Sequence, residues 1–272
     1  MEDAPTMDLH IRDKVALITG ASKGIGKAIA AVLAHEGCRV AISARGESAL
    51  RETAEEIRAA GGTVHTISAD VTHAEDATRL VGETANHFGT IHILVNNAGG
   101  IGSFSSFESL SDEDWWDVLN LNILSAVRVT RAVLPYMQKQ RWGRIINIAS
   151  ESGIQPDPLM PHYNASKAAM INLTKSLSKA YGKEGILVNT VSPAFIRTPL
   201  VDDMLAERAK AKGTTVEQAE ADFLRENRPN IVLGRAGTAE ETAVVVAFLA
   251  SEAASFITGS NYRVDGGSVA SV

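Results

Sequence analysis

The chain has 272 residues, of which 45% are hydrophobic and 21% charged, and its net charge is -6 at pH 7. This balance is that of an ordinary globular protein and shows no basic excess of the kind that binds nucleic acid. The longest apolar runs, such as residues 15–18 and 91–95, are much shorter than the ~20 residues that cross a membrane, and the acidic start at residues 1–5 is unlike a signal peptide. We therefore expect a cytoplasmic protein without nucleic-acid or membrane partners.

A strand, a glycine-rich turn and a helix follow one another near the amino terminus. Residues 1–12 are expected to form a flexible leader, residues 14–19 a buried strand, and residues 27–33 a helix with apolar side chains at helical spacing. Glycines between the two permit a tight turn, and the amino terminus of the helix offers free N–H groups to a phosphate. The turn predicts a dinucleotide-binding loop made of Gly20, Ser22, Lys23, Gly24, Ile25 and Gly26.

The end of the next strand, at residues 39–45, indicates whether the protein prefers NAD or NADP. In dinucleotide-binding folds an acidic residue near this point binds the ribose hydroxyls of NAD, whereas an arginine accommodates the 2′-phosphate of NADP. Here Ala44 occupies the acidic position and Arg45 follows it, while Lys23 can reach the same phosphate. This favours NADP(H) over NAD(H). Cys38, the single cysteine, excludes an internal disulfide and is expected to be buried.

Two further strands end in polar or small residues. The strand at residues 63–70 ends in Asp70, which can cap the next helix, and Val71 follows it. The strand at residues 91–95 ends in Asn96, Asn97, Ala98 and Gly99. Amide side chains can tie neighbouring strand ends together, and the small residues let a cofactor approach the backbone.

A long helix is expected over residues 115–141 after a helix start at Ser111. Trp115 and Trp116 are interpreted as packing residues. Asn122 lies on an otherwise apolar helical face, so its amide must find partners or cost stability. We therefore expect a hydrogen-bonded Asn122.

The apolar run at residues 145–149 reads as a buried parallel strand that delivers Ser150 at its carboxyl end, where open α/β sheets bind ligands. Tyr163 and Lys167 lie four residues apart, so on a helix they share one face, and a nearby cation favours the phenolate form of a tyrosine. Ser152 is a less suitable serine because it lies off the strand end. His162 has no identifiable carboxylate partner and is interpreted as a residue of the substrate loop or the surface.

Strands and helices continue to alternate in the last third of the chain. A strand at residues 186–192 leads to the segment Pro193–Pro199, two charged helices at about 200–232 are joined by residues 213–215, and a helix at about 238–251 precedes the strand at residues 261–264. Seven strands that alternate with helices predict one α/β domain, over residues 13–272, with a doubly wound parallel sheet of the Rossmann type.

Five spaced motifs resemble the short-chain dehydrogenase/reductase family over about residues 12–269, in its compact branch that includes 3-oxoacyl-ACP-reductase-like and carbonyl-reductase-like members. They are the G-x-x-x-G-x-G loop at 20–26, the Asn-Asn-Ala-Gly at 96–99, the Ser150, Tyr163 and Lys167 set, the segment at 193–199, and the Asp-Gly-Gly at 265–267. The chain departs from the pattern at Ala194, where the family has glycine, and a turn with positive φ would be strained there.

The resemblance implies residue roles. Tyr163 acts as acid and base, Ser150 polarises the substrate oxygen, Lys167 lowers the tyrosine pKa and holds the nicotinamide ribose, and Asn122 supports a proton relay from a local helix irregularity. The implied cofactor contacts further include Asp70, Val71, Asn97, Ala98, Gly99, Ile196 and Thr198. Residues 200–232 have the position of a substrate lid.

The expected function is an NADP(H)-dependent oxidoreductase that transfers a hydride to or from the carbonyl or alcohol carbon of a small molecule, without a metal. The family implies a homotetramer, with a homodimer as the alternative. Two other functions remain open: an epimerase or dehydratase on the same scaffold, and a sensor that binds NADP(H) without turnover.

Overall fold

The structure is a computed structural model that describes residues 8–271. Its centre is one sheet of seven parallel strands in the order β3-β2-β1-β4-β5-β6-β7. The predicted Rossmann-type sheet is therefore confirmed. The strands are β1 (Val15–Thr19), β2 (Arg39–Ala44), β3 (Thr63–Ser68), β4 (Ile93–Asn96), β5 (Gly143–Ile148), β6 (Ile186–Pro193) and β7 (Asn261–Val264).

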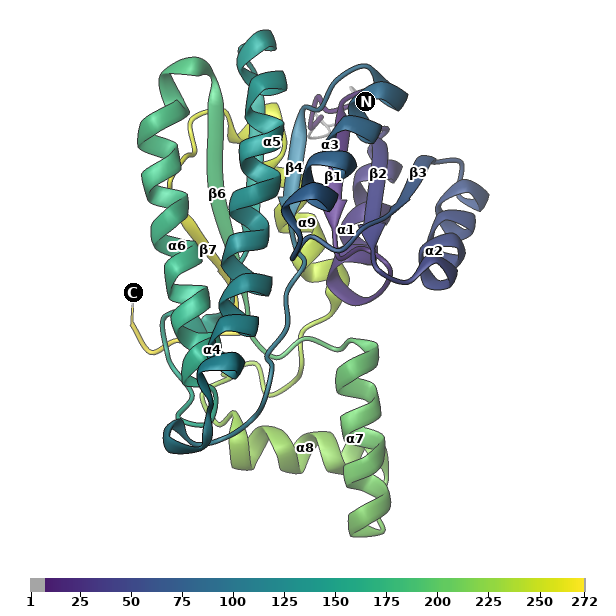
Figure 1. The fold of residues 1–272 in the computed structure, drawn as a ribbon. Helices are drawn as coiled ribbons and strands as arrows, with labels where there is room; N and C mark the ends of the chain where they lie inside the picture. Colours follow the sequence, from purple (N-terminus) through teal and green to yellow (C-terminus); the bar gives the residue numbers. More distant parts are fainter. Residues whose placement is uncertain (1–7, 272) are drawn as a thin grey trace, which may run out of the picture.

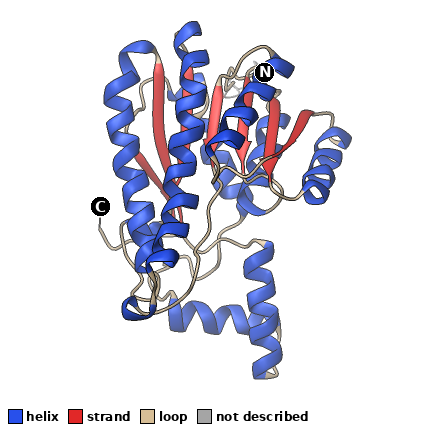
Figure 2. Cartoon of the chain, in the orientation of Figure 1, coloured by secondary structure: helices blue, strands red, loops and turns tan. Residues whose placement is uncertain are grey.

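Helices cover both faces of the sheet (Figures 1 and 2). One apolar core joins the sheet to α1, α2 and α9, and a second core joins its other face to α3, α5 and α6. The helices are α1 (Gly24–His35), α2 (Glu47–Ala59), α3 (Ala74–Phe88), α4 (Asp112–Leu119), α5 (Ser125–Gln140), α6 (Pro161–Tyr181), α7 (Pro199–Lys212), α8 (Val216–Asn227) and α9 (Ala239–Leu249).

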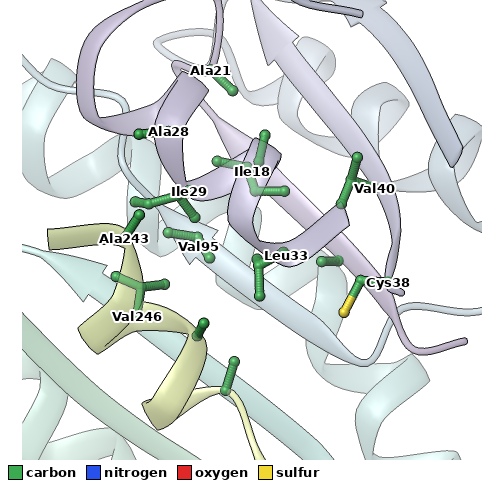
Figure 3. Packing of buried hydrophobic residues seen from close by; sticks show 14 of the residues in the cluster. Ile18, Ala21, Ala28, Ile29, Leu33, Cys38, Val40, Val95, Ala243 and Val246 are labelled. Atoms are coloured by element: carbon green, nitrogen blue, oxygen red, sulfur yellow. The ribbon is translucent and has the colours of Figure 1, made fainter. Parts of the chain in front are cut away.

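The first core shows why these sequences form these layers. Ile29 and Leu33 of α1, Val246 of α9 and Ile18 of β1 belong to one cluster, and all four side chains are fully buried (Figure 3). The α1 residues lie four apart, so they occupy one face of the helix. At ~25 cal/mol per Å² of apolar area removed from water, such contacts supply the main favourable term in folding.

The order of the strands creates the site. After β3 the chain returns to place β4 on the other side of β1, so the connections at the carboxyl ends of β1 and β4 leave in opposite directions. Open α/β sheets bind ligands in the crevice at such a switch point. In Figure 1, α7 and α8 extend beyond this same edge of the sheet, as a pair joined by a short turn. The two helices expected over 200–232 are thus present.

Buried polar side chains cross-link the carboxyl ends of β4, β5 and β6. The Asn96 amide donates to Asn147 Oδ1 (2.8 Å) and Thr130 Oγ1 (3.0 Å). The Asn147 amide donates to Thr174 Oγ1 (2.8 Å), which also accepts from the Thr190 hydroxyl (2.7 Å). We call these five residues the asparagine–threonine chain. It fixes how three parallel strands and two helices meet beside the crevice.

The amino-terminal segment differs from the expected leader. Residues 1–7 lie outside the described part of the chain, but residues 8–12 pack against the domain: Ile11 is 1% exposed, and Leu9 O accepts from the Glu252 N–H (3.1 Å). Cys38 is buried as predicted, its thiol contacts Ile11 O (3.3 Å), and burial raises the pKa of this thiol to about 12. No helix within residues 8–271 is long and apolar enough to cross a membrane.

Candidate active site

Three side chains predicted from the sequence meet where β5 ends. Ser150 lies just past β5, and its Oγ accepts a hydrogen bond from the backbone N–H of Ser152 (3.1 Å). Tyr163 and Lys167 lie one turn apart on α6, which begins at Pro161, and Lys167 Nζ is 5.5 Å from the centre of the Tyr163 ring. The Ser150 hydroxyl is also close enough to hydrogen-bond the Tyr163 phenol. Serine, tyrosine and lysine thus form one cluster.

Burial controls the protonation of this cluster. It raises the pKa of Tyr163, the charge of Glu151 raises it further, and the hydrogen bond with Ser150 opposes the shift. Burial also lowers the pKa of Lys167 to about 8, while Nζ donates to Ile148 O (2.9 Å). The expected lowering of the tyrosine pKa by Lys167 is therefore not found, because desolvation disfavours the phenolate and the ammonium alike. At neutral pH the site holds a protonated phenol, the form that can donate a proton.

Asn122 is fully buried and fully bonded, as expected. It lies in a π-helical turn (Asn120–Leu124) between α4 and α5, which is the implied helix irregularity. Its amide nitrogen donates to Gly100 O (2.8 Å) and Val118 O (3.0 Å), and its Oδ1 accepts from the Gly100 N–H (3.1 Å). A β-carbon at Gly99 would lie 2.6 Å from Asn122 Oδ1 and 3.3 Å from Lys167 Nζ. Asn122 therefore holds the strand-end loop directly against the lysine.

A cavity of about 270 Å³ opens at the switch point between β1 and β4. Eight predicted cofactor residues line it, and the structure adds five more, of which Leu121 in the π-helical turn had no sequence signal. The predicted residues are Gly20, Ser22, Lys23, Arg45, Asp70, Val71, Ala98 and Gly99, and the additional ones are Ser43, Ala44, Gly46, Ala69 and Leu121.

The glycine loop fits a close-approaching phosphate. Helix α1 begins at Gly24, earlier than the apolar pattern predicted, so its free N–H groups lie within the loop itself. Gly20 has φ +65°, and a β-carbon there would lie 2.8 Å from Ala98 Cα. Gly26 lies behind the cavity, where a β-carbon would meet Asn97 Nδ2 at 2.4 Å. Side chains at these glycines would fill or break the cradle, so the residues present fit a dinucleotide.

Asn97 fixes the loop from below instead of lining the cavity. Its amide donates to Thr19 O and Gly20 O (both 2.9 Å), and the backbone N–H groups of Asn97 and Ala98 donate to Thr19 Oγ1 (both 3.1 Å). These bonds tie the end of β4 to the end of β1. The sequence expectation that the amides join neighbouring strand ends is confirmed.

The far end of the cavity carries the charged residues. Arg45 and Lys23 are exposed at its rim. Burial alone would raise the pKa of Asp70, but hydrogen bonds from Thr72 and the positive charge of Arg45 lower it overall. Asp70 Oδ1 accepts from the Thr72 N–H (3.0 Å) and hydroxyl (2.7 Å), so it closes a turn before α3 and does not cap the helix itself.

The segment after β6 lacks the strain expected at Ala194, and Arg197 anchors it to the helices that follow. Ala194 is not among the residues with positive φ within 8–271, so alanine causes no strain there. Ile196 is buried and pairs with Gly237, and Thr198 immediately precedes α7, with its side chain against Gly24. Between them, Arg197 binds Asp202 (2.6 Å) and Glu220 (2.5 Å). This arginine, which the sequence analysis missed, ties the segment to both helices of the expected lid.

Two aromatic expectations are corrected. His162 is 0% exposed, not a surface residue, because the first turn of α6 carries it beneath Gly102 and edge-on to Trp115 (6.0 Å between ring centres). Neither of its ring nitrogens has a hydrogen-bond partner among the described residues. Trp115 does pack, with its ring edge-on to Phe107 and His162, but Trp116 is 59% exposed.

Comparisons with known proteins place this geometry in a family. A family model described as short chain dehydrogenase matches residues 14–209. The uncharacterized oxidoreductase YvrD of Bacillus subtilis is 38% identical over 266 residues, which cover 98% of this chain and 100% of that protein. The 3-oxoacyl-[acyl-carrier-protein] reductase FabG of Pseudomonas aeruginosa is 39% identical over 259 residues, which cover 95% and 98%.

A solved structure is similar along the whole fold. The crystal structure of L-sorbose reductase from Gluconobacter frateurii, complexed with NADPH and L-sorbose, has a TM-score of 0.93 and 36% identity, and the match covers 98% of this chain and 100% of that one. The protein described here is therefore an oxidoreductase and belongs to the short-chain dehydrogenase family.

Proposed function

We propose that the protein is an NADP(H)-dependent oxidoreductase that interconverts a carbonyl and an alcohol on a small molecule. The observation that carries the proposal is the position of Ser150, Tyr163 and Lys167, which lie in one cluster at the sheet edge that also holds the glycine-lined cavity. A dinucleotide bound in that cavity would supply or accept the hydride. The relatives named above include reductases of 3-oxoacyl carrier proteins and of L-sorbose, which agrees with a carbonyl substrate.

Each residue has a role that its surroundings support. Ser150 Oγ already accepts the Ser152 N–H, so its own proton is available to the substrate oxygen. Tyr163 donates a proton to that oxygen during reduction and accepts one during oxidation. The buried Lys167 would hold the ribose, and its Nζ lies 5.5 Å from the Tyr163 ring without offsetting the desolvation that raises the pKa of the phenol. Asn122 supports a proton relay from the π-helical turn.

The cofactor preference rests on charge at the cavity rim. Arg45 and Lys23 flank the position where an adenosine 2′-phosphate would lie, and Ala44 leaves no carboxylate there to repel it. We therefore propose NADP(H) in preference to NAD(H). The glycine loop, Asp70, Val71, Asn97–Gly99, Ile196 and Thr198 complete the proposed cofactor contacts.

We further propose a homotetramer assembled through α4 to α6 and the last strand. Trp116 on α4 is 59% exposed, and Phe256, close before β7, is fully exposed. Large apolar side chains of this kind are favourable at subunit contacts. Light scattering at two protein concentrations would test the assembly, and a monomer at both would contradict it.

The decisive test follows the nicotinamide absorbance while the protein is incubated with NADPH and a panel of ketones. Tyr163→Phe is expected to abolish turnover and leave NADPH binding within about threefold of the parent value. Tyr181→Phe, on the same helix and away from the cluster, is the matched control and should retain activity. Retained turnover in Tyr163→Phe would disprove the assignment, and bound NADPH without turnover of any carbonyl would indicate a sensor.

A further inference from the structure

A second cavity, of about 260 Å³, is lined in part by the residues that directly follow Ser150 in the chain. It is formed where the short helix Glu151–Gly153 and the loop after it face the end of α8 and the carboxyl-terminal segment. Its polar lining side chains include Glu151, Ser152, Gln155, Asp157, Arg228 and Ser268. Ser152 also donates its N–H to Ser150 Oγ (3.1 Å), so one residue that lines the cavity contacts the proposed reacting centre.

Glu151 is the unusual group in this cavity. It is 7% exposed, and its Oε2 has no hydrogen-bond donor among residues 8–271. Burial raises the pKa of this carboxyl, while Ser268 and the charge of Arg228 partly oppose the shift. Its charge also raises the pKa of the Tyr163 phenol. Because Oε2 is itself covered by the protein, a ligand in the cavity would reach Glu151 through Oε1, the oxygen that faces Arg228 at 3.8 Å.

The charge of the cavity limits the kind of ligand. The Arg228 guanidinium lies 3.2 Å from Asp157 Oδ2 and 3.8 Å from Glu151 Oε1, so one cation faces two carboxylates. Asp265 adds a further negative charge that acts on Glu151. A phosphate or carboxylate group would therefore be repelled, and an apolar chain would leave these polar groups without partners. Hydroxyl groups both donate and accept hydrogen bonds and carry no charge.

We propose that this cavity binds the hydroxyl groups of a neutral polyhydroxylated ketone, with Glu151 as the main hydrogen-bond acceptor. Ser152, Asp157 and Arg228 line the same cavity and offer hydrogen-bonding groups to further hydroxyls of the same molecule. The inference rests on the proposed function, which puts the reacting carbonyl at Ser150 and Tyr163. It selects polyols over the thioesters and apolar ketones that other oxidoreductases of this fold could reduce.

The first test compares kcat/KM with NADPH for three carbonyl probes. They are the ketohexoses L-sorbose and D-fructose, 2-hexanone as the chain without extra hydroxyls, and the N-acetylcysteamine thioester of acetoacetate. A site built to bind hydroxyls rejects analogues that lack them by up to about 10⁴-fold. We expect at least about 100-fold preference for one ketohexose.

Variants connect this preference to the cavity. Glu151→Gln keeps the size of the side chain and should lower kcat/KM for the ketohexose by about 10- to 100-fold, mainly through KM, because a hydrogen bond to a charged acceptor is worth roughly 1.5–3 kcal/mol. It should lower the ratio of kcat/KM for the ketohexose over kcat/KM for 2-hexanone by at least about tenfold, because any effect of the Glu151 charge on the Tyr163 phenol is common to both substrates. Glu55→Gln, an exposed carboxylate on α2, is the matched control and should change neither value.

A binding measurement separates failure of this inference from failure of the proposed function. Tyr163→Phe loaded with NADPH is titrated calorimetrically with each ketohexose, and the titration is repeated with Glu151→Gln added. If 2-hexanone or the thioester is turned over at least as well as the ketohexoses, and Glu151→Gln does not change this ranking, the proposed polyol site is wrong. The proposed oxidoreductase activity would still stand. Preference for an amino ketone would also overturn the polyol site. If no carbonyl turns over, ketohexose binding that Glu151→Gln weakens at least tenfold upholds the site, and absent binding overturns it.

Discussion

The buried charge of Lys167 is expected to lower the free energy of unfolding of this protein. The side chain is 4% exposed, and burial lowers the pKa of its ammonium from 10.5 to about 8. Below pH 8 the native state must keep a buried charge that the unfolded chain keeps in water. The shift corresponds to roughly 3 kcal/mol at about 1.4 kcal/mol for each pKa unit. Lys167→Met removes this charge at nearly constant size.

The net gain in stability of Lys167→Met is smaller than this, because the variant also loses a hydrogen bond. Lys167 Nζ donates to Ile148 O (2.9 Å), a bond worth roughly 1 kcal/mol. At pH 7 and without cofactor, Lys167→Met is therefore expected to be about 2 kcal/mol more stable than the parent, which raises Tm by roughly 4–8 °C. Turnover should be lost in the same variant.

The stability that Lys167→Met gains over the parent should decrease as the pH rises. Because the native pKa is the lower one, the unfolded state binds more protons between pH 8 and 10.5, so parental stability from this group rises with pH. At pH 9.5 the burial cost falls to roughly 1.5 kcal/mol, and the advantage of Lys167→Met should nearly disappear. Urea unfolding at pH 7, 8.5 and 9.5, at one protein concentration, measures this trend.

The matched control is Lys175→Met, an exposed lysine on the same helix, which should show a difference from the parent that does not vary with pH. A Lys167→Met protein less stable than the parent at pH 7, or equally favoured at all three pH values, would refute the reasoning from desolvation.

Three other changes test separate parts of the structure. Arg45→Asp should shift the ratio of kcat/KM for NADPH over NADH by at least about tenfold towards NADH, since a carboxylate repels the 2′-phosphate; an unchanged ratio would remove Arg45 from cofactor selection. Glu252→Leu should cost roughly 2 kcal/mol in urea unfolding because Arg144, 3% exposed and 3.2 Å from Glu252, loses its counter-charge, and a neutral effect would contradict this. Ala194→Gly should lower the free energy of unfolding by about 0.4–1 kcal/mol, and stabilisation would reveal strain at that alanine.

The sequence predicted those features that depend on local pattern. Buried parallel strands show as short β-branched runs, and their carboxyl ends meet at one edge, so Gly20, Gly99 and Ser150 could be brought together without coordinates. The helix spacing placed Tyr163 and Lys167 on one face of α6. The arrangement of the candidate site was therefore largely predictable.

The missed features depend on contacts between distant segments. His162 reads as a polar residue next to Tyr163, but the first turn of α6 buries it beneath Gly102. Arg197 and Arg228 look like ordinary surface charges in the sequence, and only the packing of α7 and α8 brings carboxylates to them. The raised pKa of Tyr163 likewise depends on desolvation, which no spacing rule measures.

The asparagine–threonine chain influences which parts of the sequence can vary without moving the site. Uniformly apolar parallel strands carry little information about register, since sliding one strand exchanges one branched side chain for another. Side-chain hydrogen bonds among Asn96, Asn147, Thr174 and Thr190 are made in the observed alignment of β4, β5 and β6 and would be lost if one strand slid. The loops that leave these strand ends can therefore lengthen, shorten or accept new residues while Ser150 keeps its position relative to Gly99. Substrate choice can vary in the loops without disturbing the alignment of the reacting groups.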